Sequence, residues 1–216
     1  MILTDPPYGV AYAEKADFYR DVVGAPLSND TIIQGDGIQS EEQYTEFTKK
    51  WLGLAVKHLV DYNTIYIFNA DTMLCSIRKA LKGVGVYYSQ ILIWVKNTVF
   101  PGRKDYLAQH ELIAYGWYGK HKRERVQSHS VLFFPKPSKS KLHPTMKPVG
   151  LLRKLILNST KTEEIIYDPF GGSGSTLIAA EELKRKCAMI EISPIYIQTI
   201  IDRWERLTGG KAVKIK

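Results

Sequence analysis

Cysteine is scarce in this 216-residue chain, and long apolar runs are absent. Cys75 and Cys187 stand far apart, which excludes a disulfide framework and the ligand spacing of a zinc site and favours a reducing, intracellular setting. The longest apolar stretches, such as residues 91–95, have the length of a strand and exclude a membrane span. The first residues also lack the basic region of a secretory signal. We therefore expect a cytoplasmic protein without a membrane partner.

Acidic residues are rare in one part of the chain. Residues 96–147 hold 11 basic side chains and only 3 acidic ones, a balance of +8, whereas the two flanking parts cancel each other. The formal charge of the whole chain is also +8, so the excess lies in one quarter of its length. This distribution excludes a uniformly basic, histone-like coat and predicts a neutral scaffold with one cationic surface.

Strands and helices are predicted to alternate along the chain. The composition, with 44% hydrophobic and 24% charged residues, is that of a globular protein, and the length suits a single domain over residues 1–216. Residues 9–39 are predicted to form a long functional loop. The predicted strands are 1–4, 64–69, 86–95, 107–117, 130–134, 164–167 and 187–191. The predicted helices are 40–60, 71–81, one beginning at 148, 175–184 and 194–208. Because several strands are apolar throughout, this order predicts an α/β fold with a mostly parallel, doubly wound sheet.

A glycine-rich segment, residues 168–175 (DPFGGSGS), follows an apolar strand and opens a helix, as nucleotide-cofactor loops do. A phosphate-gripping P-loop needs a lysine after the glycines, and none follows. A dinucleotide loop beginning at Gly172 needs glycine where Leu177 stands. S-adenosylmethionine, a nucleoside cofactor with an amino-acid tail, needs no phosphate clamp and remains open. Glu191, at the end of the next strand, stands where such folds bind ribose hydroxyls. A glycine-rich turn beside a surface acid is the alternative.

The first strand runs into Asp5-Pro6-Pro7-Tyr8. A proline-stiffened turn would explain the prolines but not the flanking acid and aromatic at a strand's carboxyl end, where open α/β sheets place their sites. An exocyclic base amine is a poor nucleophile because its lone pair is delocalised into the ring. The Asp5 carboxylate and the rigidly held Pro6 carbonyl could accept its two N–H groups and favour the pyramidal, reactive amine. Tyr8 offers a face to an extruded base.

With these two motifs in this order, and residues 143–148 (HPTMKP) between them, the chain resembles the N6-adenine/N4-cytosine DNA methylase family. The resemblance is to the circularly permuted β class of these amino-methyltransferases and covers nearly the whole chain. It implies a Rossmann-like, seven-stranded S-adenosylmethionine-dependent methyltransferase sheet. It also implies S-adenosylmethionine as cofactor, S-adenosylhomocysteine as product, no metal, and a flipped-out target base.

The resemblance further implies a role for each matching residue. The catalytic residues at the target base would be Asp5, Pro6, Pro7 and Tyr8. Glu191 would bind the cofactor ribose, Ile192 would lie against the adenine, and Thr145 and Lys147 would lie near the cofactor carboxylate. The remaining cofactor-binding residues would be Asp168, Phe170, Gly171, Gly172 and Gly174.

The chain departs from the family pattern at one point. Relatives usually carry a further strand ahead of the Asp-Pro-Pro-Tyr motif, at an edge of the sheet, whereas this chain starts within the motif strand. Our hypothesis is that residues 212–215 (AVKI), which follow the last helix, fill that vacant edge. The alternative is that the sequence is a catalytic fragment of a longer protein.

Family topology places the target-recognition region between the two halves, and this is the same cationic segment, 96–147. We expect it to be an inserted region that binds the phosphate backbone of double-stranded DNA. A merely solvated charged face is the alternative. A segment this short favours a short recognition site or a homodimer. The expected DNA-binding residues are Arg103, Lys104, Lys120, Lys122, Arg123 and Arg125, with Lys136, Lys139 and Lys141 further along.

Other candidate sites are weaker. Asp71, after a predicted strand, is expected to cap the following helix rather than to line a pocket. None of the five histidines stands at metal-ligand spacing from other potential ligands in the sequence. Cys75 and Cys187 lack the Pro-Cys context of a cytosine-C5 nucleophile, which disfavours that chemistry.

The sequence therefore predicts a site-specific DNA methyltransferase that transfers a methyl group to adenine N6, because the first motif begins with Asp. A cytosine-N4 enzyme and an RNA adenine-N6 enzyme are alternatives, and a non-catalytic DNA-binding partner subunit is an alternative of another class. A restriction-modification role and association with a prokaryotic or phage nucleoid would follow from the main reading.

Overall fold

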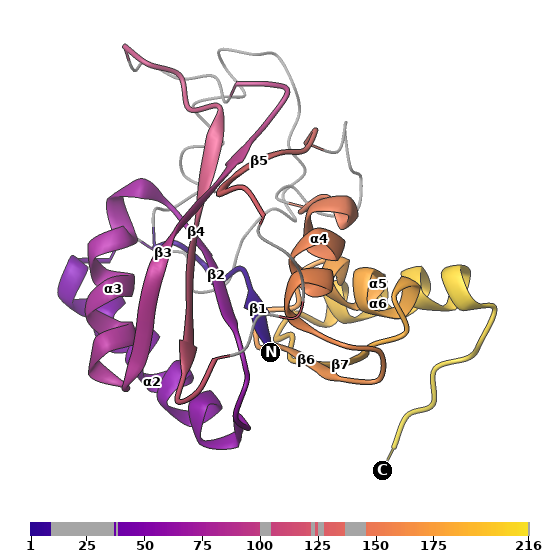
Figure 1. Ribbon diagram of the computed structural model, residues 1–216. Helices are drawn as coiled ribbons and strands as arrows, with labels where there is room; N and C mark the ends of the chain where they lie inside the picture. Colours follow the sequence, from indigo (N-terminus) through magenta and orange to yellow (C-terminus); the bar gives the residue numbers. More distant parts are fainter. Residues whose placement is uncertain are drawn as a thin grey trace.

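The computed structural model describes residues 1–9, 37, 39–99, 105–121, 124, 128–136 and 146–215, and within them seven strands form one sheet (Figure 1). The strand order is β5-β3-β4-β2-β1-β6-β7. Four strand pairs are parallel, and the two that involve β4 are antiparallel, so the mostly parallel sheet is confirmed. The bounds are β1 (Ile2–Thr4), β2 (Ile65–Asn69), β3 (Val86–Val95), β4 (His110–Tyr118), β5 (Val131–Phe133), β6 (Ile165–Asp168) and β7 (Lys186–Met189).

The helices agree closely with the sequence pattern. They are α2 (Glu41–Ala55), α3 (Leu74–Gly83), α4 (Val149–Ser159), α5 (Ser175–Glu182) and α6 (Pro194–Thr208), with short 3-10 turns at Val56–His58 and Asp71–Met73. A capping box joins Ser40 and Gln43 at the start of α2. The predicted Asp71 cap is wrong: Asp71 begins a 3-10 turn, and neither that turn nor α3 has a side-chain cap.

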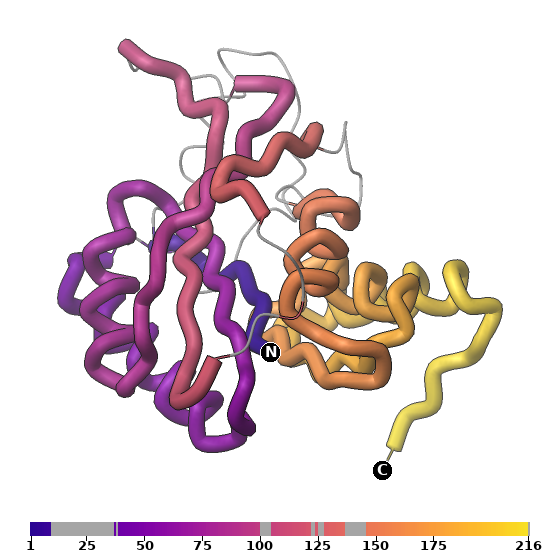
Figure 2. Tube along the Cα trace, in the orientation of Figure 1, coloured from indigo at the N-terminus to yellow at the C-terminus, as the bar shows by residue number. Residues whose placement is uncertain are grey.

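Helices cover both faces of the sheet because strand residues alternate between two cores. On β1, Ile2 packs with α2 and α3, whereas the neighbouring Leu3 packs with α4 and α5. The residues of β2 alternate in the same way. In Figure 2 the α2–α3 pair lies on one side of the sheet and α4–α6 on the other. This arrangement confirms the doubly wound fold.

The sheet topology brings several chain ends to one edge. Strands β1, β2, β6 and β7 are joined by parallel pairings, so their carboxyl ends share that edge, and the antiparallel β4 begins there. β1 occupies the centre of the sheet between β2 and β6. The segments after β1, β6 and β7 and the start of β4 therefore meet at the place where α/β sheets bind ligands.

The C-terminal tail, residues 212–215, differs from the sequence prediction that it fills an edge of the sheet. Residues 212–215 do not form a strand, and β7 remains the edge of the described sheet. Glu205 accepts hydrogen bonds from the Lys211 ammonium and the Ala212 N–H, which ties the tail to α6. Val213 and Ile215 are exposed. Among the described helices none is long and apolar enough to cross a membrane.

Segment 96–147, predicted to be an inserted region, contributes two strands to the main sheet. It contains β4, which pairs with both β2 and β3, and β5, which pairs with β3. β4 is therefore an interior strand of the sheet. The described residues that follow β3 and precede β4, 96–99 and 105–109, lie at the top of Figure 1.

Candidate active site

Asp5 is held directly beyond the carboxyl end of β1 by two donors. The Tyr8 hydroxyl donates to Asp5 Oδ1 over 2.7 Å, and the Lys147 ammonium donates to Asp5 Oδ2. Lys147 belongs to the segment that leads into α4, and its side chain is only 8% exposed. The local turn thus brings the aromatic back onto the acid, and the acid is joined to a lysine 142 residues away in sequence.

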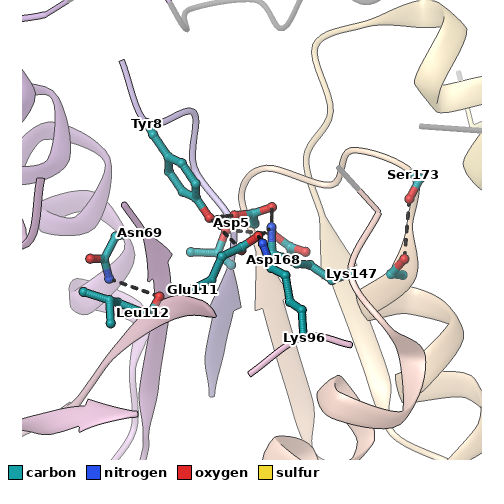
Figure 3. A network of polar contacts seen from close by, with 11 residues as sticks. Asp5, Tyr8, Asn69, Lys96, Glu111, Leu112, Lys147, Asp168 and Ser173 are labelled. Atoms are coloured by element: carbon teal, nitrogen blue, oxygen red, sulfur yellow. Dashed lines mark hydrogen bonds and ion pairs between the residues drawn. The ribbon is translucent and has the colours of Figure 1, made fainter. Parts of the chain in front are cut away.

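Glu111, the second residue of β4, completes this group. Its Oε2 lies 3.2 Å from the Lys147 ammonium and 3.4 Å from the Tyr8 hydroxyl. Its Oε1 lies 2.6 Å from the ammonium of Lys96, which directly follows β3. Figure 3 shows these side chains converging from separate elements. We call Asp5, Tyr8, Lys96, Glu111 and Lys147 the ion cluster.

The cluster balances two carboxylates against two ammonium groups, and its pKa values follow from this pairing. Burial raises the pKa of Asp5, with Lys147 opposing and Glu111 adding to the rise. Burial would also raise the pKa of Glu111, but Lys147 and Lys96 outweigh it and lower that pKa to about 2. Burial alone would lower the pKa of Lys147, yet Asp5 and Glu111 raise it. Lys147 and Glu111 are therefore charged at neutral pH.

Asp168, at the end of β6, is hydrogen-bonded to β1, the strand that leads into Asp5. The Thr4 hydroxyl donates to Asp168 Oδ1 over 2.7 Å, and the Phe170 N–H donates to the same oxygen over 3.1 Å. Burial raises the pKa of Asp168 to about 7 despite these donors and Thr176. The residue before Asp5 is thus hydrogen-bonded to the first residue of the glycine-rich segment.

The glycine-rich loop is shaped by close approaches to its neighbours. A Cβ on Gly171 would lie 2.6 Å from the Met189 sulfur, and Gly174, at φ +78°, would place a Cβ 3.0 Å from Ile200. The guanidinium of Arg203, from α6, donates to the Ser173 carbonyl. A larger residue at Gly171 or Gly174 would require the side chain of Met189 or Ile200 to move, and at Gly174 it would also be strained by the positive φ.

Glu191 closes the loop from the end of β7. Its Oε2 accepts the Gly172 N–H over 2.7 Å, and its Oε1 accepts the Ser193 N–H over 2.8 Å. Each oxygen keeps a second lone-pair site for a further donor such as a ribose hydroxyl. The next residue, Ile192, is 73% exposed and offers apolar surface beside this carboxylate.

Phe170 links the loop to the other face of the sheet. Its ring lies 5.5 Å from that of Trp51 in an edge-on arrangement and 5.9 Å from that of Phe47, both on α2. The side chain therefore packs on α2.

The structure describes two of the basic residues that were predicted to bind ligands. Lys147, predicted to lie near the cofactor carboxylate, shares its ammonium between Asp5 and Glu111, because these buried acids need a counter-charge. Lys120, predicted to bind DNA, follows the far end of β4 and lies 3.2 Å from Asp61. Seven residues of strand separate Glu111 from Tyr118, which amounts to roughly 20–25 Å. The other expected residues lie outside the described part: Arg103, Lys104, Lys122, Arg123, Arg125 and Thr145.

The sequence analysis missed Thr4, Lys96 and Glu111 as site residues. Glu111 carried one signal, since it is one of three acids in the cationic segment and stands near the start of an apolar strand. Lys96 carried a weaker one, directly after the apolar run 86–95. Their contact depends on the antiparallel pairing of β3 with β4, which places Val95 opposite His110.

The sheet order, the acid after its central strand and the glycine-rich loop after the adjacent strand define the class of protein, an α/β fold of the methyltransferase type. Among solved structures, that of the M1.HpyAVI–SAM complex superposes with a TM-score of 0.67 at 24% identity, over 94% of this chain and 87% of that one. The PvuII DNA methyltransferase, described as cytosine-N4-specific, superposes with a TM-score of 0.72 at 15% identity, over 94% and 78%.

Sequence comparison identifies the family. A family model described as DNA methylase, of the N6/N4 methyltransferase type, matches residues 1–133 and 127–202. The type II methyltransferase M2.DpnII of Streptococcus pneumoniae is 26% identical, over 95% of this chain and 82% of the relative. M2.LlaDCHI of Lactococcus lactis subsp. cremoris is 25% identical, over 92% and 79%. The chain belongs to the N6-adenine/N4-cytosine DNA methylase family.

Proposed function

We propose that this protein transfers a methyl group from S-adenosylmethionine to the exocyclic N6 of an adenine flipped out of double-stranded DNA. The observation that carries the proposal is the hydrogen bond of 2.7 Å between Thr4 and Asp168. It joins the strand that ends at Asp5 to the strand that ends at the glycine-rich loop. A base amine at Asp5 and a methyl donor held by that loop would lie side by side.

The residues after β6 and β7 fit this cofactor. Glu191 has free lone-pair sites for ribose hydroxyls, and the exposed Ile192 offers apolar surface for an adenine ring. The loop contains no lysine for a phosphate, in keeping with a cofactor that carries none. S-adenosylmethionine supplies a methyl group on a sulfonium, whose sulfur keeps the electron pair of the broken S–C bond.

Asp5 and the Pro6 carbonyl act on the target amine. By accepting its two N–H groups they favour the pyramidal nitrogen, whose lone pair forms the new N–C bond. The nitrogen then loses one proton, for which the Asp5 carboxylate is the adjacent acceptor. The hydroxyl of Tyr8 is bound to Asp5, so its ring is held beside the position of the base.

Adenine is favoured over cytosine because the motif begins with a carboxylate, although both bases present the same amine geometry. The relatives are named type II methyltransferases, which supports site-specific DNA as the substrate. Incubation with duplex DNA and S-adenosylmethionine, followed by mass spectrometry of the nucleosides, separates the products. N6-methyladenine supports the proposal, whereas N4-methylcytosine assigns the other base. Faster turnover on structured RNA assigns the RNA alternative.

The catalytic role of Asp5 has a direct test. Asp5→Ala should lower kcat by roughly 10²–10⁴-fold and leave the Kd for S-adenosylmethionine unchanged, because Asp5 is proposed to contact the amine and not the cofactor. Asp71→Ala, which removes an exposed acid after β2, is the matched control. Full activity in Asp5→Ala would refute the mechanism. If the wild-type protein neither binds S-adenosylmethionine nor transfers a methyl group, the result would instead support the alternative of a non-catalytic DNA-binding subunit.

A further inference from the structure

The acceptor that the target amine needs is already engaged. Asp5 Oδ1 accepts the Tyr8 hydroxyl and Oδ2 accepts the Lys147 ammonium. A carboxylate whose charge is neutralised by a contacting ammonium is a weaker acceptor for a further, neutral N–H. Lys147 therefore stabilises Asp5 in the buried site and at the same time weakens the interaction that Asp5 must make with a base.

Glu111 lies within reach of both donors. Its Oε2 lies 3.2 Å from the Lys147 ammonium and accepts the Tyr8 hydroxyl over 3.4 Å, so both donors already contact Glu111, and a movement of a few tenths of an ångström would shorten either contact to a strong hydrogen bond. The remaining oxygen, Oε1, is fixed by Lys96 at 2.6 Å. Lys96 thus holds one oxygen of Glu111, and the other oxygen faces the two donors that are bound to Asp5.

We propose that Glu111 is a positioning residue that takes over Lys147 and Tyr8 from Asp5 when the target amine binds. This inference rests on the proposed methyl transfer. The exchange keeps Lys147 paired, since it moves from one carboxylate to another, and the N–H groups of the base amine replace its ammonium at Asp5. Asp5 regains its strength as an acceptor only when a base is present.

Lys96 sets the balance of this exchange. Its ammonium competes with Lys147 for the charge of Glu111, so it weakens the hold of Glu111 on Lys147. Removing Lys96 should draw Lys147 towards Glu111 and away from Asp5. Removing the charge of Glu111 should do the opposite and leave Lys147 on Asp5.

The test compares Glu111→Gln, Glu111→Asp and Lys96→Met with wild type in methyl transfer to duplex DNA across pH. Glu111→Gln should lower kcat roughly ten- to a hundredfold, with an unchanged Kd for S-adenosylmethionine. It removes a negative charge that raises the pKa of Asp5, so the acidic limb of the rate profile should move to lower pH. Lys96→Met should move that limb to higher pH. Glu111→Asp keeps the charge and should leave the limb in place while lowering kcat.

The control is Glu182→Gln, which removes a carboxylate at the end of α5 that is paired with Arg153 at 3.1 Å and has no contact with the ion cluster among the described residues, and it should leave the profile unchanged. Thermal unfolding shows whether each variant is folded. If Glu111→Gln does not fold, Lys96→Met still tests the inference, because it should shift the acidic limb in the opposite direction. Active wild type together with unshifted limbs in Glu111→Gln and Lys96→Met would overturn the inference alone. Wild type that binds the cofactor without methyl transfer would overturn the proposed function.

Discussion

The buried carboxyl of Asp168 is expected to lower the stability of the protein as the pH rises from about 4 to about 7, and Asp168→Asn tests this expectation. Burial raises the pKa of Asp168 from 3.8 to about 7, so the folded state holds a proton that the unfolded chain has already lost. For an acid with a raised folded-state pKa, the stability is highest below the unfolded value and falls as the pH rises towards the folded value. The pH window of this loss is therefore about 4 to 7.

The size of the effect follows from the two pKa values. A tenfold change in proton affinity corresponds to about 1.4 kcal/mol, so the raised pKa of Asp168 lowers the free energy of unfolding, relative to its value at low pH, by about 4 kcal/mol at pH 8 and about 2 kcal/mol at pH 5. Asparagine does not ionise and keeps an oxygen for the Thr4 hydroxyl and the Phe170 N–H. Its amide N–H can donate to the hydroxyl of Thr176. Asp168→Asn should therefore be more stable than wild type, with the larger gain at pH 8.

Urea unfolding followed by circular dichroism at pH 5, 6.5 and 8 measures the difference. The comparison between variants cancels the titration of groups that both proteins share. Asp202→Asn replaces an exposed acid on α6 that accepts a hydrogen bond from Gln198; it is the control and should show no pH-dependent change. A gain in Asp168→Asn that is equal at all three pH values would refute the reasoning, because it would mean that Asp168 does not titrate in this window.

Two further predictions concern ligand binding. Glu191→Gln should raise the Kd for S-adenosylmethionine roughly ten- to a hundredfold in calorimetry, because the ribose loses a charged acceptor; an unchanged Kd would exclude Glu191 from the cofactor site. Lys136 follows β5, lies near Lys96 and has no ion pair among the described residues. Its pKa is lowered mainly by burial and further by the charge of Lys96. Lys136→Gln should therefore reduce the slope of log Kd for DNA against log salt by about 0.9, whereas Lys120→Gln, remote and paired with Asp61, should leave it unchanged; the reverse result would place the DNA at the other end of the sheet.

Much of the fold could be predicted because local patterns agree with it. The strand 86–95 has the predicted bounds because an unbroken apolar run has the length of a strand, and α2 begins after the predicted capping box at Ser40. The tail 212–215 was predicted wrongly by the same kind of reasoning. Its alternating apolar residues suit a strand, but Glu205 binds its first residues and holds them on α6.

The site was only half predictable. Asp5, Tyr8 and Glu191 stand in motifs whose chemistry can be read from adjacent residues. Lys96 and Glu111 meet through the pairing of two strands, and the contact of Lys147 with Asp5 spans 142 residues. No local pattern encodes such contacts, since the hydrophobic periodicity that sets the strands says nothing about which polar residues meet at their ends.

The ion cluster also changes how the charge of segment 96–147 is understood. Two of its lysines, Lys96 and Lys147, are buried with Asp5 and Glu111, because two carboxylates at this depth are tolerated only with equal positive charge. A third, Lys120, is paired with Asp61 at the other end of the sheet. Part of the cationic excess thus belongs to the catalytic site and the scaffold. We expect the DNA-binding surface among the cations that are not used in this way, and among the described residues of the segment Lys136, near Lys96, is such a cation.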